Sequence, residues 1–150
     1  MLWLNMSDEK LICRTRGNGT DKYWSLNGQY HRVDGPAIEY TNGTKLWYLN
    51  GKLHRPDGPA IEHANGDKEW YLNGKCHRVG GPAAEYEGGI KYWYQNGGFH
   101  RGDGPAAEYA DGNKNWYLND RICKPIEVFK AATHEQRIHL LCFYASEFMP

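Results

Sequence analysis

A 23-residue interval repeats along most of this chain. Tryptophan recurs at that interval, as Trp24, Trp47, Trp70, Trp93 and Trp116. Three further columns follow the same step: a His-Arg pair (from His31-Arg32 to His100-Arg101), a glutamate (Glu39, Glu62, Glu85, Glu108) and a lysine (Lys45, Lys68, Lys91, Lys114). Four full units occupy residues 24–115, between a degenerate half-unit and a truncated unit at 116–123. Such a period predicts a stack of similar units that bury apolar surface against one another.

Within each unit, short runs of β-forming residues alternate with Asn-Gly or Asp-Gly steps. The stretch AIEHANGDKEWYLNGK contains two such steps, Asn65-Gly66 and Asn73-Gly74. Asn and Gly both tolerate positive φ, which a two-residue type I′ hairpin turn requires at its central positions. We therefore expect a mainly β fold, an elongated antiparallel sheet of serial hairpins over residues 1–123, with a helical segment over 124–150.

The stretch GPAIEYTNGTKLWYLNGKLHRPDGPA resembles MORN repeats. The residues that fall on the family pattern are Gly35, Tyr40, Asn42-Gly43, Trp47, Asn50-Gly51 and His54, whereas Arg55 stands where the family usually has glycine. The chain is most similar to the MORN-variant subgroup with Trp-Tyr-x-Asn-Gly and His-Arg-x-Asp-Gly-Pro-Ala, found in bacteriophage, giant-virus and bacterial antitoxin-like proteins. The resemblance covers about residues 17–123 and implies an elongated MORN-like sheet.

MORN arrays serve mainly as binding and scaffold modules on many unrelated proteins. The resemblance therefore implies a non-enzymatic protein-binding module. The subgroup implies a phage or viral protein that binds and inhibits a host factor, such as a defence or nucleic-acid-processing protein, in the host cytoplasm. Two alternatives stay open: a small-molecule binder that sequesters a nucleotide-like ligand with its aromatic and arginine columns, and a structural scaffold or antitoxin-like protein. No cofactor is expected.

Two columns are the candidate binding residues. If Asn50-Gly51 closes a two-residue turn, Trp47 pairs with His54 and Tyr48 with Leu53, so tryptophans and tyrosines lie on opposite faces. The tyrosine column offers rigid anchors with both a ring and a hydroxyl, unless the C-terminal helices bury it and leave the tryptophan face exposed. This column consists of Tyr48, Tyr71, Tyr94 and Tyr117.

The arginine column, Arg32, Arg55, Arg78 and Arg101, suits phosphate or carboxylate ligands. The alternative is a ladder of ion pairs with Asp34, Asp57, Asp103 or the glutamate column. The lysine column is expected to pair with the glutamates across each hairpin.

The segment KPIEVFKAATHEQRIHLLCFYASEF leaves the repeat and predicts helix. Pro125 suits a first helical turn, and Thr133 with Gln136 has capping-box spacing. The expected buried stripe is Ile138, Leu141, Cys142, Ala145 and Phe148. We expect a cap on the last strand's open edge. The alternative is a partner-binding element or a homodimer contact.

A catalytic or metal role for the histidine column is not expected. His54 with Asp57 resembles a base and its orienting acid, but the motif occurs four times and its third copy has Gly80 in place of the aspartate. Asp-Gly and Gly-Pro steps are typical of turns. Equivalent histidines should lie roughly 10 Å apart, two strands away. A zinc ion needs all its ligands at about 2 Å.

Composition excludes some partner classes. Eighteen basic and eighteen acidic residues cancel, which argues against non-specific nucleic-acid or membrane binding. The N-terminal sequence has no signal-peptide pattern, and no apolar run is long enough to cross a membrane. The four scattered cysteines favour reduced thiols, so we expect a cytoplasmic protein.

Overall fold

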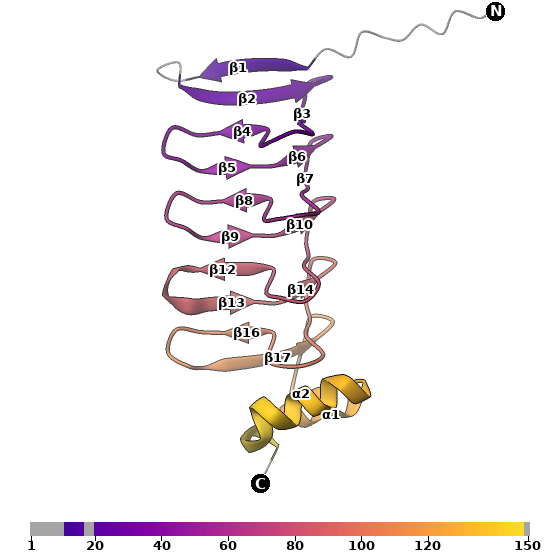
Figure 1. Ribbon diagram of the computed structural model, residues 1–150. Helices are drawn as coiled ribbons and strands as arrows, with labels where there is room; N and C mark the ends of the chain where they lie inside the picture. Colours follow the sequence, from indigo (N-terminus) through magenta and orange to yellow (C-terminus); the bar gives the residue numbers. More distant parts are fainter. Residues whose placement is uncertain (1–10, 17–19, 149–150) are drawn as a thin grey trace, which may run out of the picture.

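The computed structural model is a tall stack of antiparallel strands with two helices at its C-terminal end (Figure 1). It describes residues 11–16 and 20–148. The expected mainly β fold of serial hairpins with a C-terminal helical segment is confirmed. Residues 1–10, the start of the expected array and the stretch without a signal-peptide pattern, lie outside the described residues.

Each full unit adds two short strands to one long main sheet. Successive strands pair antiparallel, and the charged columns meet across them: Lys45 lies opposite Glu39 on one side and Glu62 on the other. The expected register of lysine and glutamate is thus confirmed. The strands of the main sheet are β1 (Ile12–Arg16), β2 (Asp21–Leu26), β4 (Ile38–Glu39), β5 (Lys45–Leu46), β8 (Ile61–Glu62), β9 (Lys68–Glu69), β12 (Ala84–Tyr86), β13 (Ile90–Tyr92), β16 (Ala107–Glu108), β17 (Lys114–Leu118) and β18 (Arg121–Cys123).

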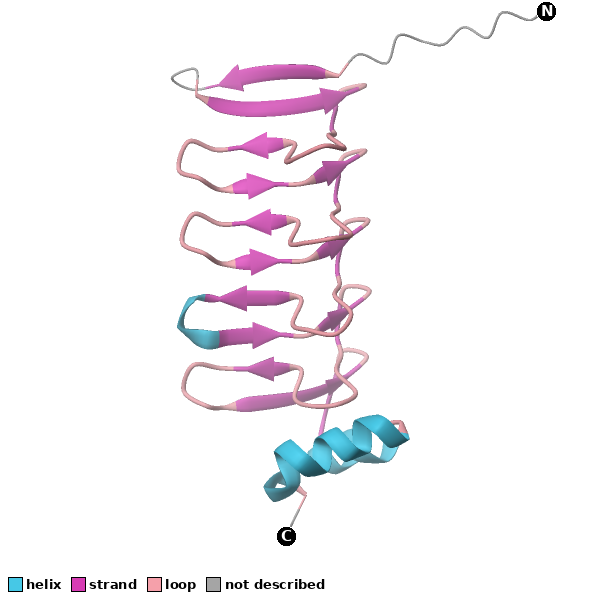
Figure 2. Ribbon diagram, in the orientation of Figure 1, coloured by secondary structure: helices cyan, strands magenta, loops and turns pink. Residues whose placement is uncertain are grey.

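A second set of short hairpins turns aside from the main sheet, as Figure 2 shows at the right of the stack. These side hairpins are β6 (Tyr48–Leu49) with β7 (Lys52–Leu53), β10 (Tyr71–Leu72) with β11 (Lys75–Cys76), and β14 (Tyr94–Gln95) with β15 (Gly98–Phe99), while β3 (Gln29–Tyr30) pairs with β2. The predicted register is confirmed, with Tyr48 opposite Leu53 and Leu49 opposite Lys52. Neighbouring side hairpins are also bonded, because the N–H of Gly51 donates to the carbonyl of Tyr30 (2.9 Å).

Tryptophan is the corner between the two sets of strands. The N–H of Trp47 donates to the carbonyl of Ala60 in the next main-sheet segment (2.8 Å), while its own carbonyl accepts from the N–H of His54 in the side hairpin (3.0 Å). The same pair of bonds recurs at Trp24, Trp70 and Trp93. Each unit therefore contributes to two sheet surfaces, where the sequence predicted one continuous hairpin sheet.

The Asn-Gly steps form two kinds of turn. In the side hairpins both residues have positive φ, as at Asn50 (49°) and Gly51 (73°), which confirms type I′ turns there. The main-sheet step Asn42-Gly43 was predicted to be the same and is not, since only Gly43 has positive φ (94°). There the Asn42 side chain accepts the N–H of Thr44 (2.9 Å), and the N–H of Gly43 donates to Tyr40 (3.0 Å). The loop between Tyr40 and Thr44 has three residues, one more than the two-residue loop of a side hairpin, and this makes the main-sheet turn wider. In the third unit the short helix η1 (Glu87–Gly89) takes this position.

The arginine of each unit locks the loop that follows the side hairpin. Its guanidinium lies over the unit's tryptophan, with Cζ 3.8–4.1 Å from the ring centroid in all four copies. Nη1 of Arg55 also donates to the carbonyl of Pro59 (3.1 Å) and to Glu62 (2.8 Å). The expected ion pairs with the glutamate column and with Asp34, Asp57 and Asp103 are present.

The other residues of the His-Arg-x-Asp-Gly-Pro-Ala motif also stabilise the corner between the main sheet and the side hairpin. A Cβ on Gly58 would lie 2.8 Å from Cζ of Arg55, so this position excludes a side chain while the arginine keeps its place. Ala60 is fully buried. Nδ1 of His54 accepts the N–H of Asn73 in the next unit (3.1 Å). His54 thus bonds to backbone, and Asp57 pairs with Arg55.

Helices α1 (Pro125–Ala131) and α2 (His134–Tyr144), followed by η2 (Ala145–Glu147), cover the last tryptophan. Trp116 packs with Val128, Ala132 and Leu140 in a buried cluster. Lys124, directly after the truncated unit, stands where the full units have arginine, so helices replace the guanidinium over this ring. Pro125 stands in the first turn of α1, and the predicted capping box of Thr133 and Gln136 is present.

The predicted buried stripe of α2 is wrong in part. Ile138, Leu141 and Cys142 are exposed, whereas Leu140 is fully buried and Tyr144 and Phe148 pack against the same cluster. Leu140 and Tyr144 are one helical turn apart in α2, and Phe148 follows the short helix η2. The α1–α2 turn decides which apolar line faces Trp116, and the spacing within α2 does not reveal it.

Substitution of Gly58 by Ala should cost about 1–3 kcal/mol of unfolding free energy, because the new Cβ displaces the guanidinium from Trp47. Arg55→Ala should cost about 2–3 kcal/mol through the lost ring contact and charged hydrogen bonds. Chemical denaturation should show that the double variant costs less than the sum, since both changes remove one interaction. Asp57→Ala is the control, within about 0.5 kcal/mol of wild type. Additive costs would contradict this role for Gly58.

Leu140→Ala should lower the free energy of unfolding by about 2–5 kcal/mol, because it opens a cavity beside Trp116. Leu141→Ala is the matched control: its side chain is 54% exposed, and the expected change is within about 0.5 kcal/mol. Thermal and denaturant unfolding of the two variants measures the difference. Equal losses would show that the helix packs through another side.

Candidate functional site

The two predicted sets of binding residues lie on opposite faces. The arginines lie over the tryptophans and use their Nη1 groups on the proline carbonyl and the glutamate of their own unit. The hollows beside them, of about 530 Å³ and 320 Å³ in the second and third units, are lined by the arginine, tryptophan and histidine columns and by no tyrosine. The arginine column is therefore part of the corner, and its donors are largely engaged.

The tyrosine column lies on the other face, and its four members are half-buried. Tyr94 contacts Phe99 across its own side hairpin (centroids 4.2 Å apart). Other rings meet between neighbouring units: Tyr48 contacts Tyr30 (5.5 Å), and Phe99 contacts Tyr117 (5.0 Å). The helices pack against Trp116 at the end of the stack, so the predicted burial of this column beneath them is wrong.

Sequence reasoning missed the main-sheet rings that extend this surface. Tyr23 contacts both Tyr30 and Tyr40 (6.1 Å each), and Tyr92 contacts Phe99 (5.6 Å) and Tyr109 (5.9 Å). We call the surface formed by the tyrosine column and these rings the aromatic face. The signal was present in the sequence, because Tyr40, Tyr86 and Tyr109 recur at the repeat interval except at His63. The members of the aromatic face beyond the predicted column are Tyr23, Tyr30, Tyr40, Tyr86, Tyr92, Phe99 and Tyr109.

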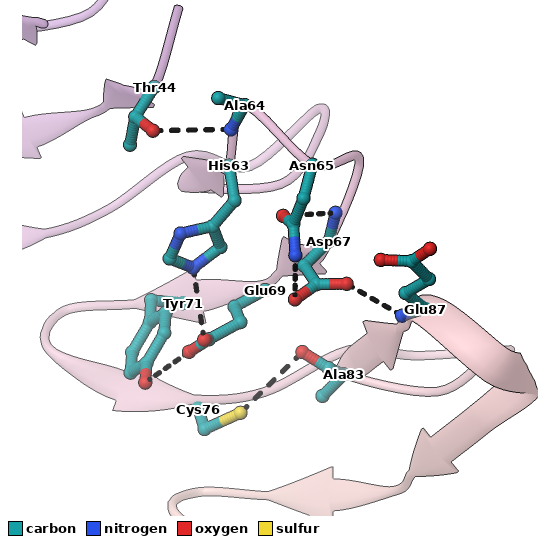
Figure 3. A network of polar contacts seen from close by, with 10 residues as sticks. All are labelled: Thr44, His63, Ala64, Asn65, Asp67, Glu69, Tyr71, Cys76, Ala83 and Glu87. Atoms are coloured by element: carbon teal, nitrogen blue, oxygen red, sulfur yellow. Dashed lines mark hydrogen bonds and ion pairs between the residues drawn. The ribbon is translucent and has the colours of Figure 1, made fainter. Parts of the chain in front are cut away.

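A polar cluster interrupts the aromatic face where the second unit meets the third (Figure 3). Glu69 occupies the position that holds Tyr23, Leu46, Tyr92 and Asn115 in the other units. Its carboxylate accepts the hydroxyl of Tyr71 (2.9 Å) and lies 3.4 Å from Nε2 of His63. Cys76 is nearby and donates to the carbonyl of Ala83 (3.6 Å).

The phenols and the thiol of this cluster are held in their neutral forms. Burial, reinforced by the charge of Glu69, raises the pKa of Cys76 to about 12. Burial likewise raises the pKa of Tyr94 to about 12. The pKa values of Tyr71 and Tyr86 are also raised, first by burial and then by the neighbouring Glu69. At neutral pH the cluster presents phenol hydroxyls and a protonated thiol, so Cys76 is not an activated nucleophile.

A hollow of about 350 Å³ opens beside Glu69 on the aromatic face. Its volume is at the lower end of the range typical of ligand sites. Its lining residues are Glu69, Tyr71, Gly74, Lys75, Cys76, Ala84, Tyr86, Tyr94 and Gly97.

Across the described part of the chain, no three His, Cys, Asp or Glu side chains are placed to hold a metal ion. No helix within residues 11–16 and 20–148 is long and apolar enough to cross a membrane.

The sequence matches no protein-family model, and no curated protein shows significant similarity to it. The candidate site is therefore defined by its geometry, a ladder of rings with one carboxylate.

Thiol labelling should separate Cys76 from the exposed cysteines. At pH 8 we expect Cys13 and Cys142, both exposed, to react with iodoacetamide at least about a hundredfold faster than Cys76, because the thiolate is the nucleophile. A raised pKa keeps the thiol protonated, so the Cys76 rate should still climb with pH at alkaline pH values. Peptide mass spectrometry after timed quenching measures each site. Equal rates at Cys76 and Cys142 would contradict the buried environment.

Proposed function

We propose that this chain is a non-enzymatic protein-binding module that receives its partner on the aromatic face. The observation that carries the proposal is the ladder of half-buried rings, interrupted at Glu69, which the C-terminal helices leave uncovered. Tyrosine is favoured at interfaces because its ring buries a large apolar area, its hydroxyl bonds, and its side chain loses little entropy.

The dimensions of the ladder support a macromolecular partner. Each unit adds two main-sheet strands, about 10 Å of stack, so the column from Tyr48 to Tyr117 spans roughly 30 Å. A standard protein interface covers about 800 Å² on each partner, which is a patch of that width. A nucleotide-like ligand finds less support, because the arginines that would hold its phosphates already contact tryptophan, carbonyl and carboxylate groups.

The resemblance to MORN repeats supports the same proposal, since those arrays serve as binding and scaffold modules. Its phage and viral members favour a host protein in the cytoplasm as the partner, with inhibition as the outcome. The chemistry of the face favours a partner that presents apolar side chains to the rings.

Capture experiments test the proposal. Immobilised wild type should recover a partner from a lysate of cells that harbour the gene, and Tyr48/Tyr71/Tyr94→Ala should lose it, since each central aromatic anchor contributes about 2 kcal/mol or more. The matched control is Val33→Ala/Val79→Ala, because these valines are 82% and 83% exposed in the loops of the arginine motif. Quantitative mass spectrometry of the recovered proteins measures the difference.

A milder variant controls for loss of folding, because the triple substitution removes half-buried rings that pack within the sheet. Tyr40→Ser/Ile122→Ser changes exposed members of the same face, since Ile122 lies opposite Tyr117 and is 62% exposed. It should weaken capture while leaving the melting temperature within a few degrees of wild type. Full recovery by both variants would overturn the assignment of the aromatic face.

A further inference from the structure

The second unit ends on a charge, Glu69, that its repeat does not balance. The four glutamates of the repeating column each pair with the arginine of their unit, at 2.7–3.3 Å. Glu69 belongs to another column, and its side chain is only 16% exposed. Within the described residues its ion-pair contact is His63, and no lysine or arginine reaches it. A carboxylate removed from water favours a compensating cation.

Aromatic rings stand around this carboxylate. Tyr71, Tyr86 and Tyr94 line the same 350 Å³ hollow as Glu69, and Ala84 with Gly74 and Gly97 adds small groups. The phenols stay neutral, so their faces keep the negative quadrupole that attracts cations. Lys75 stands at the rim: it is exposed, and its Cβ and Cγ pass 3.8 and 3.9 Å from where a Cβ on Gly97 would be.

We propose that this hollow binds the cationic end of a basic side chain, the ammonium of lysine or the guanidinium of arginine, presented by the protein partner. This inference rests on the proposed function and names the chemistry that the aromatic face selects. The alkyl stem would lie against the tyrosine rings, and the cationic head would donate to Glu69. Charge-assisted hydrogen bonds to a carboxylate are stronger than neutral ones.

Glu69 has capacity for such a ligand. A carboxylate has about four lone-pair directions. Tyr71 and His63 each contact one oxygen, and Tyr86 also hydrogen-bonds to the carboxylate, so about one direction is left for a cationic donor. A bound metal ion fits less well, because hard cations take six or more oxygen ligands and the hollow offers a single carboxylate. An anionic ligand would meet Glu69 directly.

Titration with small probes tests the hollow without knowledge of the partner. The probes are the N-acetyl methylamides of lysine, arginine and norleucine, and the readout is the amide NMR spectrum of the full chain. The lysine or the arginine probe, or both, should give saturable shifts at Glu69, Tyr71, Tyr86 and Tyr94. Norleucine, which has the stem without the charge, should give none that saturate. The two charged probes also show which head group the hollow prefers.

Three variants make the test specific. Glu69→Leu installs the residue found at the same position one unit earlier, Leu46, so the repeat itself shows that the fold accepts it. Glu69→Gln keeps the shape and an acceptor for Tyr71. Both should weaken the charged probes at least about tenfold. Glu87→Gln, which removes an exposed charge from the next main-sheet turn, should leave the affinity unchanged. Thermal unfolding confirms that each variant is folded.

Two results would overturn the inference: no saturable shift with either charged probe, or equal affinities in wild type and Glu69→Leu. The capture experiment tests the protein-binding function separately from the probe titration. If wild type recovers a partner through the tyrosines while neither charged probe binds, the cation hollow is wrong and the protein-binding function stands. If the charged probes bind in a Glu69-dependent manner and no partner is recovered, the hollow stands and the protein-binding function is wrong.

Discussion

The contact between arginine and tryptophan is the interaction on which this repeat depends. In every full unit the guanidinium lies over the indole while its Nη1 group donates to the proline carbonyl and to the glutamate of the following strand. The chain leaves the main sheet at the tryptophan and returns to it at that strand. One side chain therefore fixes the detour into the side hairpin, and a glycine must follow because the arginine occupies the space of its Cβ.

The end of the array shows what happens when that contact is missing. Directly after the truncated unit Lys124 stands at the arginine position, and Trp116 would have no guanidinium above it. Two helices cover it instead, with Leu140 and Val128 fully buried beside the ring. Trp116 is 4% exposed, and it is the buried tryptophan of the described chain. The helical segment thus replaces, with apolar packing, what the repeat does with a charged side chain.

The turns and the strand register could be predicted from the sequence because they depend on short local patterns that repeat along the chain. Asn50-Gly51 fixes its own turn, that turn fixes the register of Tyr48 with Leu53, and the repeat copies both. Features that depend on how segments meet in space could not be predicted in this way. The corner at Trp47 and the buried side of α2 are of this kind. Glu69 was visible as a deviation from its column, but its significance required the structure to place Tyr71, Tyr86 and Tyr94 around it.

The bonds between neighbouring units have an evolutionary consequence. Each unit makes three repeated hydrogen bonds with its successor. The histidine Nδ1 accepts an asparagine N–H, the arginine N–H donates to a tyrosine carbonyl, and a carbonyl of the side hairpin accepts the N–H of the residue after that asparagine. Duplication or loss of one whole 23-residue unit would therefore preserve every type of contact and change only the length of the stack. Side chains that take no part in the corner contacts, Glu69 among them, would be copied or lost together with their unit. A gene built this way can reorder the proposed binding positions along the surface of the protein by recombination alone, without changing the scaffold that presents them.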